Sequence, residues 1–302
     1  MTPLLMIGGA TGSGKSDIAV ACAEKLNGEI ISADSMQIYR GLDIGTAKIT
    51  AEEMRGIPHH LIDVCSPEES FTAADYKKKA QEAIADILSR GKTPIVCGGT
   101  GLYFNAILYD LSFSGEFDPA LRESLLREAK EKGKAAMHEK LRELNPETAA
   151  RLHPNDEKRV IRAIEKALTG GQKESDFQEA KYPYLLFVTN LPREVLYERI
   201  DKRVDRMISA GIMAEVERLR TNGIDYDKQC MQAIAYKEWA ELERGMTEAE
   251  VIALIKKNTR NYAKRQITWF KQYKDAVSLS VQGRSAEEIA EEAVKIYQEE
   301  KQ

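Results

Sequence analysis

The sequence predicts an α/β protein with a parallel sheet at its centre and a helical insertion in the middle of the chain. Over the first hundred residues, short apolar runs alternate with amphipathic helical patterns, which is typical of a parallel sheet whose two faces are covered. From about residue 113 to residue 182 the apolar runs stop and charge-rich helical patterns replace them. We therefore predict an α/β core formed by residues 1–112 and 183–302, interrupted by a helical insertion domain of residues 113–182.

The elements follow from these patterns in order. Short apolar runs predict strands at residues 3–9, 29–34, 93–99 and 182–190. Longer periodic patterns predict core helices at residues 15–26, 73–91, 193–223 and 246–273. Within the insertion, the same periodicity predicts helices at residues 118–152 and 154–171, the second ending at Gly170 and Gly171. The last third of the chain is therefore expected to be mostly helical.

Composition excludes several classes of protein. The chain has 302 residues with a net charge of −4, and no run of eighteen apolar residues that could cross a bilayer. Its four cysteines and four histidines show no metal-ligand spacing, so we expect reduced thiols, a cytoplasmic protein and no transition-metal site. The acidic balance argues against wholesale coating of nucleic acid. Residues 256–274 nevertheless contain seven Lys or Arg and no acid.

A glycine-rich segment joins the first predicted strand to the first predicted helix. It reads Gly9-Ala10-Thr11-Gly12-Ser13-Gly14-Lys15-Ser16 and matches GxxxxGK[ST] throughout. The glycines let backbone N–H groups converge on phosphate oxygens, and the helix N-terminus adds a favourable partial charge. Lys15 is expected to neutralise a terminal phosphate and Ser16 to hold Mg²⁺. The alternative is a glycine-rich turn without a ligand, but all of these features agree on a P-loop. We therefore expect the core to be P-loop NTPase-like.

The motif does not identify the molecule that carries the phosphates. In nucleotide hydrolases a second strand usually ends in an acid that supports Mg²⁺ and the attacking water. The strand at 93–99 ends without an acid, and Asp63 lies in a segment rich in Pro and His. Asp34 directly follows a predicted strand, but it belongs to a longer polar cluster. The usual hydrolase interpretation is therefore doubtful.

That polar cluster follows the second predicted strand. Asp34, Ser35 and Gln37 lie at the carboxyl end of the strand, where open α/β sheets bind their ligands. Asp34 can accept a proton or a hydrogen bond from an amine, and the other two can donate and accept, as reading a base edge requires. A second small-residue segment, 45–48, ends in a cation. An ordinary loop with capping residues is the alternative, and the neighbouring phosphate loop disfavours it.

Taken together, these segments resemble the tRNA dimethylallyltransferase family, also called tRNA isopentenyltransferases. The resemblance covers nearly the whole chain and runs in the order of the family, through GGATGSGKS, DSMQIYRGLDIGTAK, PHHLIDV, GGTGLYF, RLHPNDEKRVIRAIE, QAIAYKE and TRNYAKRQITWF. The family usually has Pro where this chain has Ala10, and Gly where it has Ala235. Both replacements are small and are expected to lie away from the chemistry.

The resemblance implies transfer of a dimethylallyl group from dimethylallyl diphosphate to the exocyclic N6 amine of an adenine. This adenine lies immediately 3′ of the anticodon (adenine-37), and the products are N6-isopentenyladenine and diphosphate. The phosphate loop would bind the diphosphate as a leaving group, with Mg²⁺ at Ser16 and no activated water. Asp34 is the candidate general base, or the acceptor that orients the amine. Thr100, after the third strand, would help position the amine or the diphosphate.

An arginine should close on the diphosphate from the far side. The helical segment after the fourth predicted strand offers Arg193, Arg199, Arg203 and Arg206. Arg203 matches the family pattern best and is the third candidate catalytic residue. Arg199 and Arg203 share a helix face, so periodicity does not separate them.

The resemblance also implies contacts with the anticodon stem-loop, because the adenine must leave its stack to reach the site. The expected tRNA-binding residues are Asp34, Ser35, Met36, Gln37, Thr100, Lys158, Arg159, Arg162, Arg260 and Lys264. Trp269 and Phe270 are expected to be core residues, since aromatic side chains mostly serve burial. The expected partners are tRNA and dimethylallyl diphosphate. We expect the protein to be a monomer and to have no membrane partner.

Two alternatives remain at this point. One is a P-loop kinase or NTPase acting on a small molecule. The other is an adenylate isopentenyltransferase acting on free nucleotides, which would need neither the helical insertion nor the basic segment at 256–274.

Overall fold

The computed structural model describes residues 3–109, 118–169 and 180–300. It divides into two compact units, Met1–Tyr109 with Ala180–Gln302 and Asp110–Glu179. The predicted insertion at 113–182 is offset from the second unit by three residues at each end, and its residues 113–117 and 170–179 lie outside the described residues. Each unit has a hydrophobic core of its own.

A single parallel sheet forms the centre of the first unit. Its six strands run in the order β3-β2-β4-β1-β5-β6, and every pairing is parallel. Their bounds are β1 Leu4–Gly9, β2 Gly28–Ala33, β3 His59–His60, β4 Thr93–Gly98, β5 Tyr184–Asn190 and β6 Val277–Ser280. The predicted mixed α/β fold with a parallel sheet is confirmed. Sequence patterns missed the two edge strands, because two and four residues are too few to show a period.

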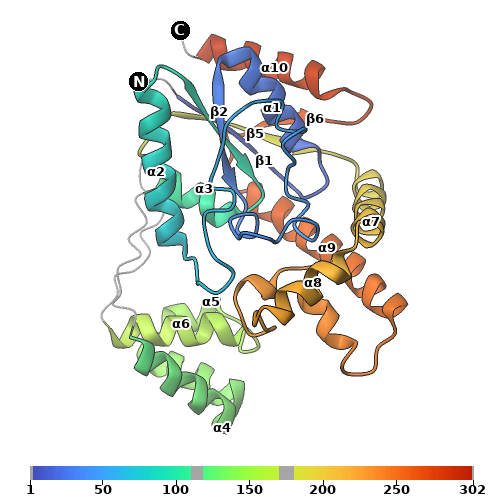
Figure 1. Cartoon of the computed structure of the whole chain (residues 1–302). Coiled ribbons are helices and arrows are strands. Elements are labelled where there is room, and N and C mark those ends of the chain that lie inside the picture. Colours follow the sequence, from blue (N-terminus) through green and yellow to red (C-terminus); the bar gives the residue numbers. More distant parts are fainter. Residues whose placement is uncertain (1–2, 110–117, 170–179, 301–302) are drawn as a thin grey trace. The chain divides into compact units, whose positions relative to one another are not determined.

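Helices cover the sheet and extend beyond it (Figure 1). The predicted helix at 193–223 is two helices, because Gly211 takes a left-handed conformation with φ of 90° between them. The helices are α1 Lys15–Leu26, α2 Ala73–Ser89, α3 Gly101–Leu108, α7 Arg193–Ser209, α8 Ile212–Thr221, α9 Glu248–Phe270 and α10 Ala286–Glu300, with short 3-10 helices η1 Cys230–Gln232 and η2 Lys237–Glu241. The last helix, α10, was not predicted.

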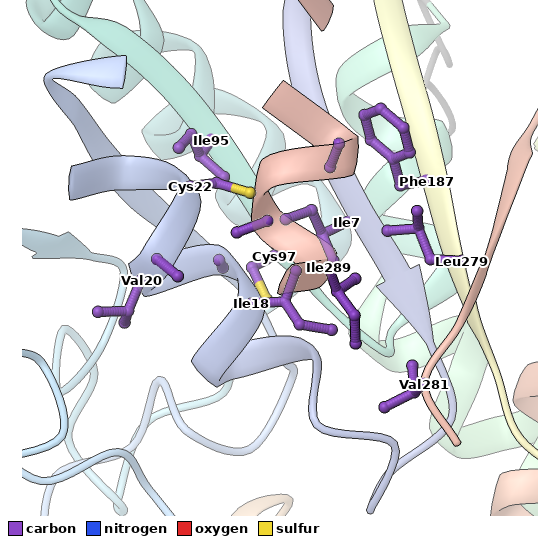
Figure 2. Packing of buried hydrophobic residues seen from close by; sticks show 14 of the residues in the cluster. Ile7, Ile18, Val20, Cys22, Ile95, Cys97, Phe187, Leu279, Val281 and Ile289 are labelled. Atoms are coloured by element: carbon purple, nitrogen blue, oxygen red, sulfur yellow. The ribbon is translucent and has the colours of Figure 1, made fainter. Parts of the chain in front are cut away.

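The core of the first unit lies where α1 and α10 pack against the sheet. Figure 2 shows Ile18 of α1, Ile289 of α10, Ile7 of β1 and Phe187 of β5 within this one cluster. All four side chains are at most 1% exposed. Truncating one such side chain to Ala typically costs about 2–5 kcal/mol, so this core holds the strand ends described below in place.

The second unit consists of helices and their short connections in its described part. It contains α4 Pro119–Leu144, α5 Pro146–Arg151 and α6 Glu157–Leu168. The side chains of Asn145 and Asp156 cap α5 and α6 by accepting backbone N–H groups, which is the usual role of these residue types at a helix start. Buried Leu125, Leu141 and Ile164 form part of its core.

Two expectations from composition concern membrane-spanning helices and the cysteines. Among the described residues, no helix is both long enough and apolar enough to span a membrane. The four cysteines are free and buried.

Candidate functional site

Three loops emerge side by side at the carboxyl end of the sheet. The register places Gly8 of β1 and Ala33 of β2 on either side of Gly98 of β4. The phosphate loop follows β1, Asp34 follows β2 and Thr100 follows β4. Helices α7, α8 and α9 gather beside these loops (Figure 1). The parallel topology thus brings the predicted loop, acid and threonine together.

The phosphate loop has the conformation that its glycines permit. Gly12 and Gly14 take φ of 79° and 83°, a region that favours glycine, and α1 begins directly afterwards at Lys15. The Ser13 hydroxyl is buried, donates to the Ala10 carbonyl at 2.8 Å and pairs with Thr189 on β5 at 2.6 Å. The side chain of Ser13 therefore ties the loop to the sheet.

Two cavities adjoin this loop. The large cavity, of about 630 Å³, is lined by Gly12, Gly14, Lys15 and Ser16 of the loop together with Arg199, Arg203 and Arg206 of α7. The small cavity, of about 230 Å³, is lined by Thr11, Asp34, Ser35, Met36, Ala235, Tyr262 and Arg265 among others. Arg203 and Met207 line both cavities. A ligand spanning the two would place its phosphates in the large cavity and its other end beside Asp34.

Asp34 is held by its own loop and keeps one oxygen available. Its Oδ1 accepts the backbone N–H groups of Met36 at 2.9 Å and Gln37 at 3.4 Å. Within the described residues, Oδ2 has no hydrogen-bond partner. The Gln37 amide instead donates to the carbonyls of Thr46 and Ala47. The structure thus aligns Asp34 toward the small cavity and uses Gln37 to hold a neighbouring loop.

Thr100 supports this arrangement from β4. Its Oγ1 accepts the backbone N–H of Ser35 at 3.1 Å and donates to the Ser35 hydroxyl at 3.4 Å. Tyr262, on α9, lines the cavity next to it. Burial raises the pKa of Tyr262 to about 12, with the Asp34 charge acting in the same direction and a hydrogen bond to Thr100 opposing it. Tyr262 is therefore a neutral hydroxyl and an aromatic face in the small cavity.

Of the four candidate arginines, Arg203 alone lines both cavities. Its Nη2 donates to the Thr46 carbonyl at 2.9 Å, and burial lowers the pKa of its guanidinium while Asp34 opposes this effect. Arg199 and Arg206 line only the large cavity. Arg193 lies over the ring of Tyr197 at 5.1 Å. The geometry therefore distinguishes Arg203 from Arg199, which periodicity did not.

Cations concentrate at the junction of the cavities. Burial lowers the pKa of Lys15, and the charge of Arg203 adds to this effect while Asp34 opposes it. Burial raises the pKa of Cys97 to about 12, so this thiol is neutral where it donates to the Lys15 carbonyl at 3.6 Å. These two positive side chains share a single nearby acid, Asp34, so an anion bound between them would lower the cost of holding them together. The site is therefore built for an anionic ligand.

Ala235 lies closer to the site than expected. It lines the small cavity and has φ of 73°, a left-handed conformation that favours the glycine which the family resemblance predicts here. Its N–H donates to Glu238 at 2.8 Å and its carbonyl accepts the Trp239 indole N–H at 3.0 Å. The expectation that this replacement sits away from the chemistry is wrong, because the turn at Ala235 forms part of the cavity wall.

Gln266 is a site residue that sequence reasoning missed. It is 4% exposed, its Oε1 accepts the backbone N–H of Thr11 at 2.8 Å, and its Nε2 donates to the Gly99 carbonyl at 2.9 Å. It thereby joins α9 to both the phosphate loop and the loop after β4. No local sequence signal marks this amide, because its burial and its distant partner Thr11 appear only in the fold.

The basic residues predicted to bind tRNA lie in both units. In the second unit, Arg162 pairs with the buried Glu165 at 3.2 Å and Arg159 with Asp156 at 3.5 Å, whereas Lys158 is exposed. In the first unit, Arg260 pairs with Asp201 of α7 at 2.5 Å, and Lys264 is exposed. Phe270 is buried as expected. The Trp269 ring occupies the space that a side chain on Gly101 would need.

The fit of a metal ion follows from the donor atoms. The described residues contain no cluster of three His, Cys, Asp or Glu that could hold a metal by themselves. Ser16 and Asp17 do offer oxygen atoms in the large cavity. Mg²⁺ commonly takes one or two protein oxygens together with substrate phosphates and water. The donor set therefore fits Mg²⁺ bound along with a phosphate ligand.

Comparison with known proteins places the chain among relatives of similar length. Residues 37–273 match the family model of IPP transferase. A tRNA dimethylallyltransferase from an Exiguobacterium strain is 46% identical over 96% of this chain and 93% of its own length, and the one from Bacillus subtilis is 45% identical over 89% and 88%.

Solved structures agree with this result. The tRNA isopentenylpyrophosphate transferase from Bacillus halodurans has a TM-score of 0.76 and 41% identity, covering 100% of this chain and 98% of its own. A eukaryotic dimethylallyltransferase acting on tRNA has a TM-score of 0.78 and 29% identity, covering 94% and 75%. The chain therefore belongs to the IPP transferase family, as its ordered sequence motifs indicate.

Proposed function

We propose that this chain transfers a dimethylallyl group from dimethylallyl diphosphate to N6 of adenine-37, the base 3′ of the anticodon in tRNA. One observation carries the proposal: the phosphate loop and Asp34 open onto two cavities that meet at Arg203. That arrangement suits a reaction in which a diphosphate leaves on one side while an amine attacks on the other. A cytoplasmic enzyme acting as a monomer is consistent with this substrate.

In the proposed step, the adenine amine attacks the allylic carbon and forms the new N–C bond. The C–O bond of the donor breaks, and its electron pair leaves with the diphosphate. The amine proton passes to Asp34, whose Oδ2 has no partner among the described residues. An aromatic amine is a weak nucleophile, so its alignment contributes as much as proton removal.

On the opposite side, the loop would hold the diphosphate as negative charge develops on it. Gly12, Gly14 and the first residues of α1 line the large cavity, and a helix N-terminus favours an anion. Lys15 and Arg203 line this cavity and supply positive charge that is in place before the reaction begins, so little reorganisation is needed. When bound, Mg²⁺ would neutralise further charge on the leaving group, held by the Ser16 hydroxyl with Asp17 nearby.

The acceptor base would enter the small cavity. Tyr262 presents an aromatic face there, backed by Arg265 at 5.5 Å from the ring centroid, and base–aromatic stacking is worth about 1–3 kcal/mol. Exposed cations of each unit would contact tRNA phosphates. Lys264 and Lys158 are exposed and, within the described residues, make no ion pair, so they are the best suited of the predicted tRNA-binding residues.

A labelling assay tests the function. Purified protein is incubated with radiolabelled dimethylallyl diphosphate and a tRNA transcript carrying adenine-37, the same transcript with guanine-37, or AMP. We expect label only in the first. Label in AMP would instead favour a nucleotide isopentenyltransferase, and ATP hydrolysis without prenyl transfer would favour a P-loop kinase or NTPase.

Matched variants test the base. Asp34→Asn keeps the acceptor for the two backbone N–H groups but removes the free carboxylate oxygen, and we expect the transfer rate to fall by about 10²–10⁴-fold. Asp275→Asn makes the same chemical change at an exposed turn and should leave the rate unchanged. Full activity of Asp34→Asn would refute the role of Asp34.

A further inference from the structure

A buried carboxylate outside the residues discussed above holds the loop that lines both cavities. Glu215, on α8, is 2% exposed. Its two oxygens accept the backbone N–H groups of Asp43 at 3.1 Å, Ile44 at 3.0 and 3.1 Å, and Gly45 at 3.3 Å. Successive N–H groups that converge on one carboxylate fix the path of the backbone that carries them.

Tyr236 contacts both Glu215 and the same loop. Its hydroxyl donates to Glu215 at 2.5 Å. Burial and the adjacent Glu215 raise the pKa of Tyr236 well above its usual range, so the hydroxyl keeps its proton and acts as donor. A Cβ on Gly45 would lie 2.4 Å from the Tyr236 ring. Only glycine therefore allows the ring, the loop and the carboxylate to meet.

The anchored loop continues directly into the site. Gly45 and Thr46 line the small cavity, while Ile44 and Ala47 line the large one. The Thr46 carbonyl accepts the hydrogen bond from Arg203, the arginine common to both cavities. The position of this carbonyl depends on the three N–H groups that precede it, and hence on Glu215.

We propose that Glu215 is a positioning residue for prenyl transfer. It fixes the loop at 43–47 so that the Thr46 carbonyl holds the Arg203 guanidinium at the junction of the cavities, where the diphosphate departs. Glu215 touches neither substrate and acts through Arg203. This inference rests on the function proposed above.

A double-mutant cycle tests this route. Glu215→Gln keeps the size of the side chain but turns an amide N–H₂ toward backbone donors. We expect it to lower the single-turnover rate at saturating substrates about tenfold or more in the wild-type background, and less than about twofold in an Arg203→Ala background. An equal loss in both backgrounds would overturn the proposal. Glu217→Gln, an exposed change on the same helix, should leave the rate unaltered.

A second variant and a binding measurement cover the case in which Glu215→Gln fails to fold. Tyr236→Phe removes one hydrogen bond and leaves the carboxylate in place. By calorimetry we expect it to weaken binding of inorganic diphosphate by about twofold to fivefold, with the KM for tRNA unchanged. Undiminished diphosphate affinity in this variant contradicts the proposal. If the wild-type protein transfers no prenyl group, the proposed function fails, whereas the diphosphate titration still reports on the loop.

Discussion

The left-handed turn at Ala235 predicts an unusual response to removing a methyl group. Ala235 is 3% exposed with φ of 73°, and Ala233, two residues earlier, is 5% exposed with φ of −62°. Both residues line the small cavity. The two alanines therefore provide a matched pair that differs chiefly in backbone conformation.

The expected magnitudes follow from three contributions. Replacing either alanine by glycine loses about 0.8 kcal/mol of methyl burial and adds about 0.5–1 kcal/mol of chain entropy to be lost on folding. At Ala233 these sum to a loss of about 1.5 kcal/mol in the free energy of unfolding. At Ala235, relief of the left-handed strain returns about 1–2 kcal/mol. Ala235→Gly should therefore be nearly neutral, while Ala233→Gly destabilises.

Urea unfolding followed by tryptophan fluorescence measures the difference. Both tryptophans, Trp239 and Trp269, lie in the first unit, and Trp239 is hydrogen bonded to the Ala235 carbonyl, so the signal reports on the turn. We expect the two variants to differ by about 1–2 kcal/mol at unchanged slope. If Ala235→Gly proved as destabilising as Ala233→Gly, the conformational argument would be wrong.

Three further predictions concern charge. Lys15→Met should slow prenyl transfer more than about 100-fold yet raise the free energy of unfolding, because partial burial lowers the pKa of Lys15 and makes its charge costly. A variant with full activity would contradict this prediction. Hydrogen bonds from Arg90 hold the pKa of Glu29 well below its usual range. Glu29 therefore stabilises the folded state at pH values above its unfolded pKa of about 4.3, and this stabilisation is lost as the pH falls below that value. Glu29→Gln should cost about 2–3 kcal/mol at pH 7 and flatten the acid limb of a stability–pH profile, and a profile as steep as that of the wild type would exclude this role. Lys264→Ala should reduce the slope of log binding constant against log salt for tRNA by about 1, and an unchanged slope would remove Lys264 from the interface.

The sequence predicted those parts of the fold that depend on local signals. The helix at 15–26 was predicted at its observed bounds, because the phosphate loop defines its start and an apolar periodicity defines its length. Four of the six strands were found within one or two residues. The edge strands were missed because they are recognisable only by their pairing, as when Val277 of β6 aligns with Phe187 of β5.

The candidate site likewise contains residues that could be predicted from the sequence and residues that could not. Asp34 and Thr100 could be placed together from the sequence, because parallel strands bring their carboxyl ends to one edge. Gln266 could not be placed, since its partner Thr11 lies 255 residues away and nothing in the local pattern of α9 marks that residue. Glu215 presents the same problem, as its partners in the loop at 43–45 are 170 or more residues distant.

The basic helix α9 shows why a charge run alone is an incomplete guide to function. The basic run led to a prediction of tRNA contacts at Arg260 and Lys264, but Arg260 forms an ion pair with Asp201 of α7. Lys256, on the same helix, likewise pairs with Asp205 of α7. Those pairs fasten α9 to the helix that carries Arg203, whereas the buried Gln266 fastens it to the phosphate loop. The segment therefore serves two purposes, and only its exposed cations remain for nucleic acid. Because the same helix contacts the loops that would hold the donor, bound tRNA and bound diphosphate are expected to share one supporting framework.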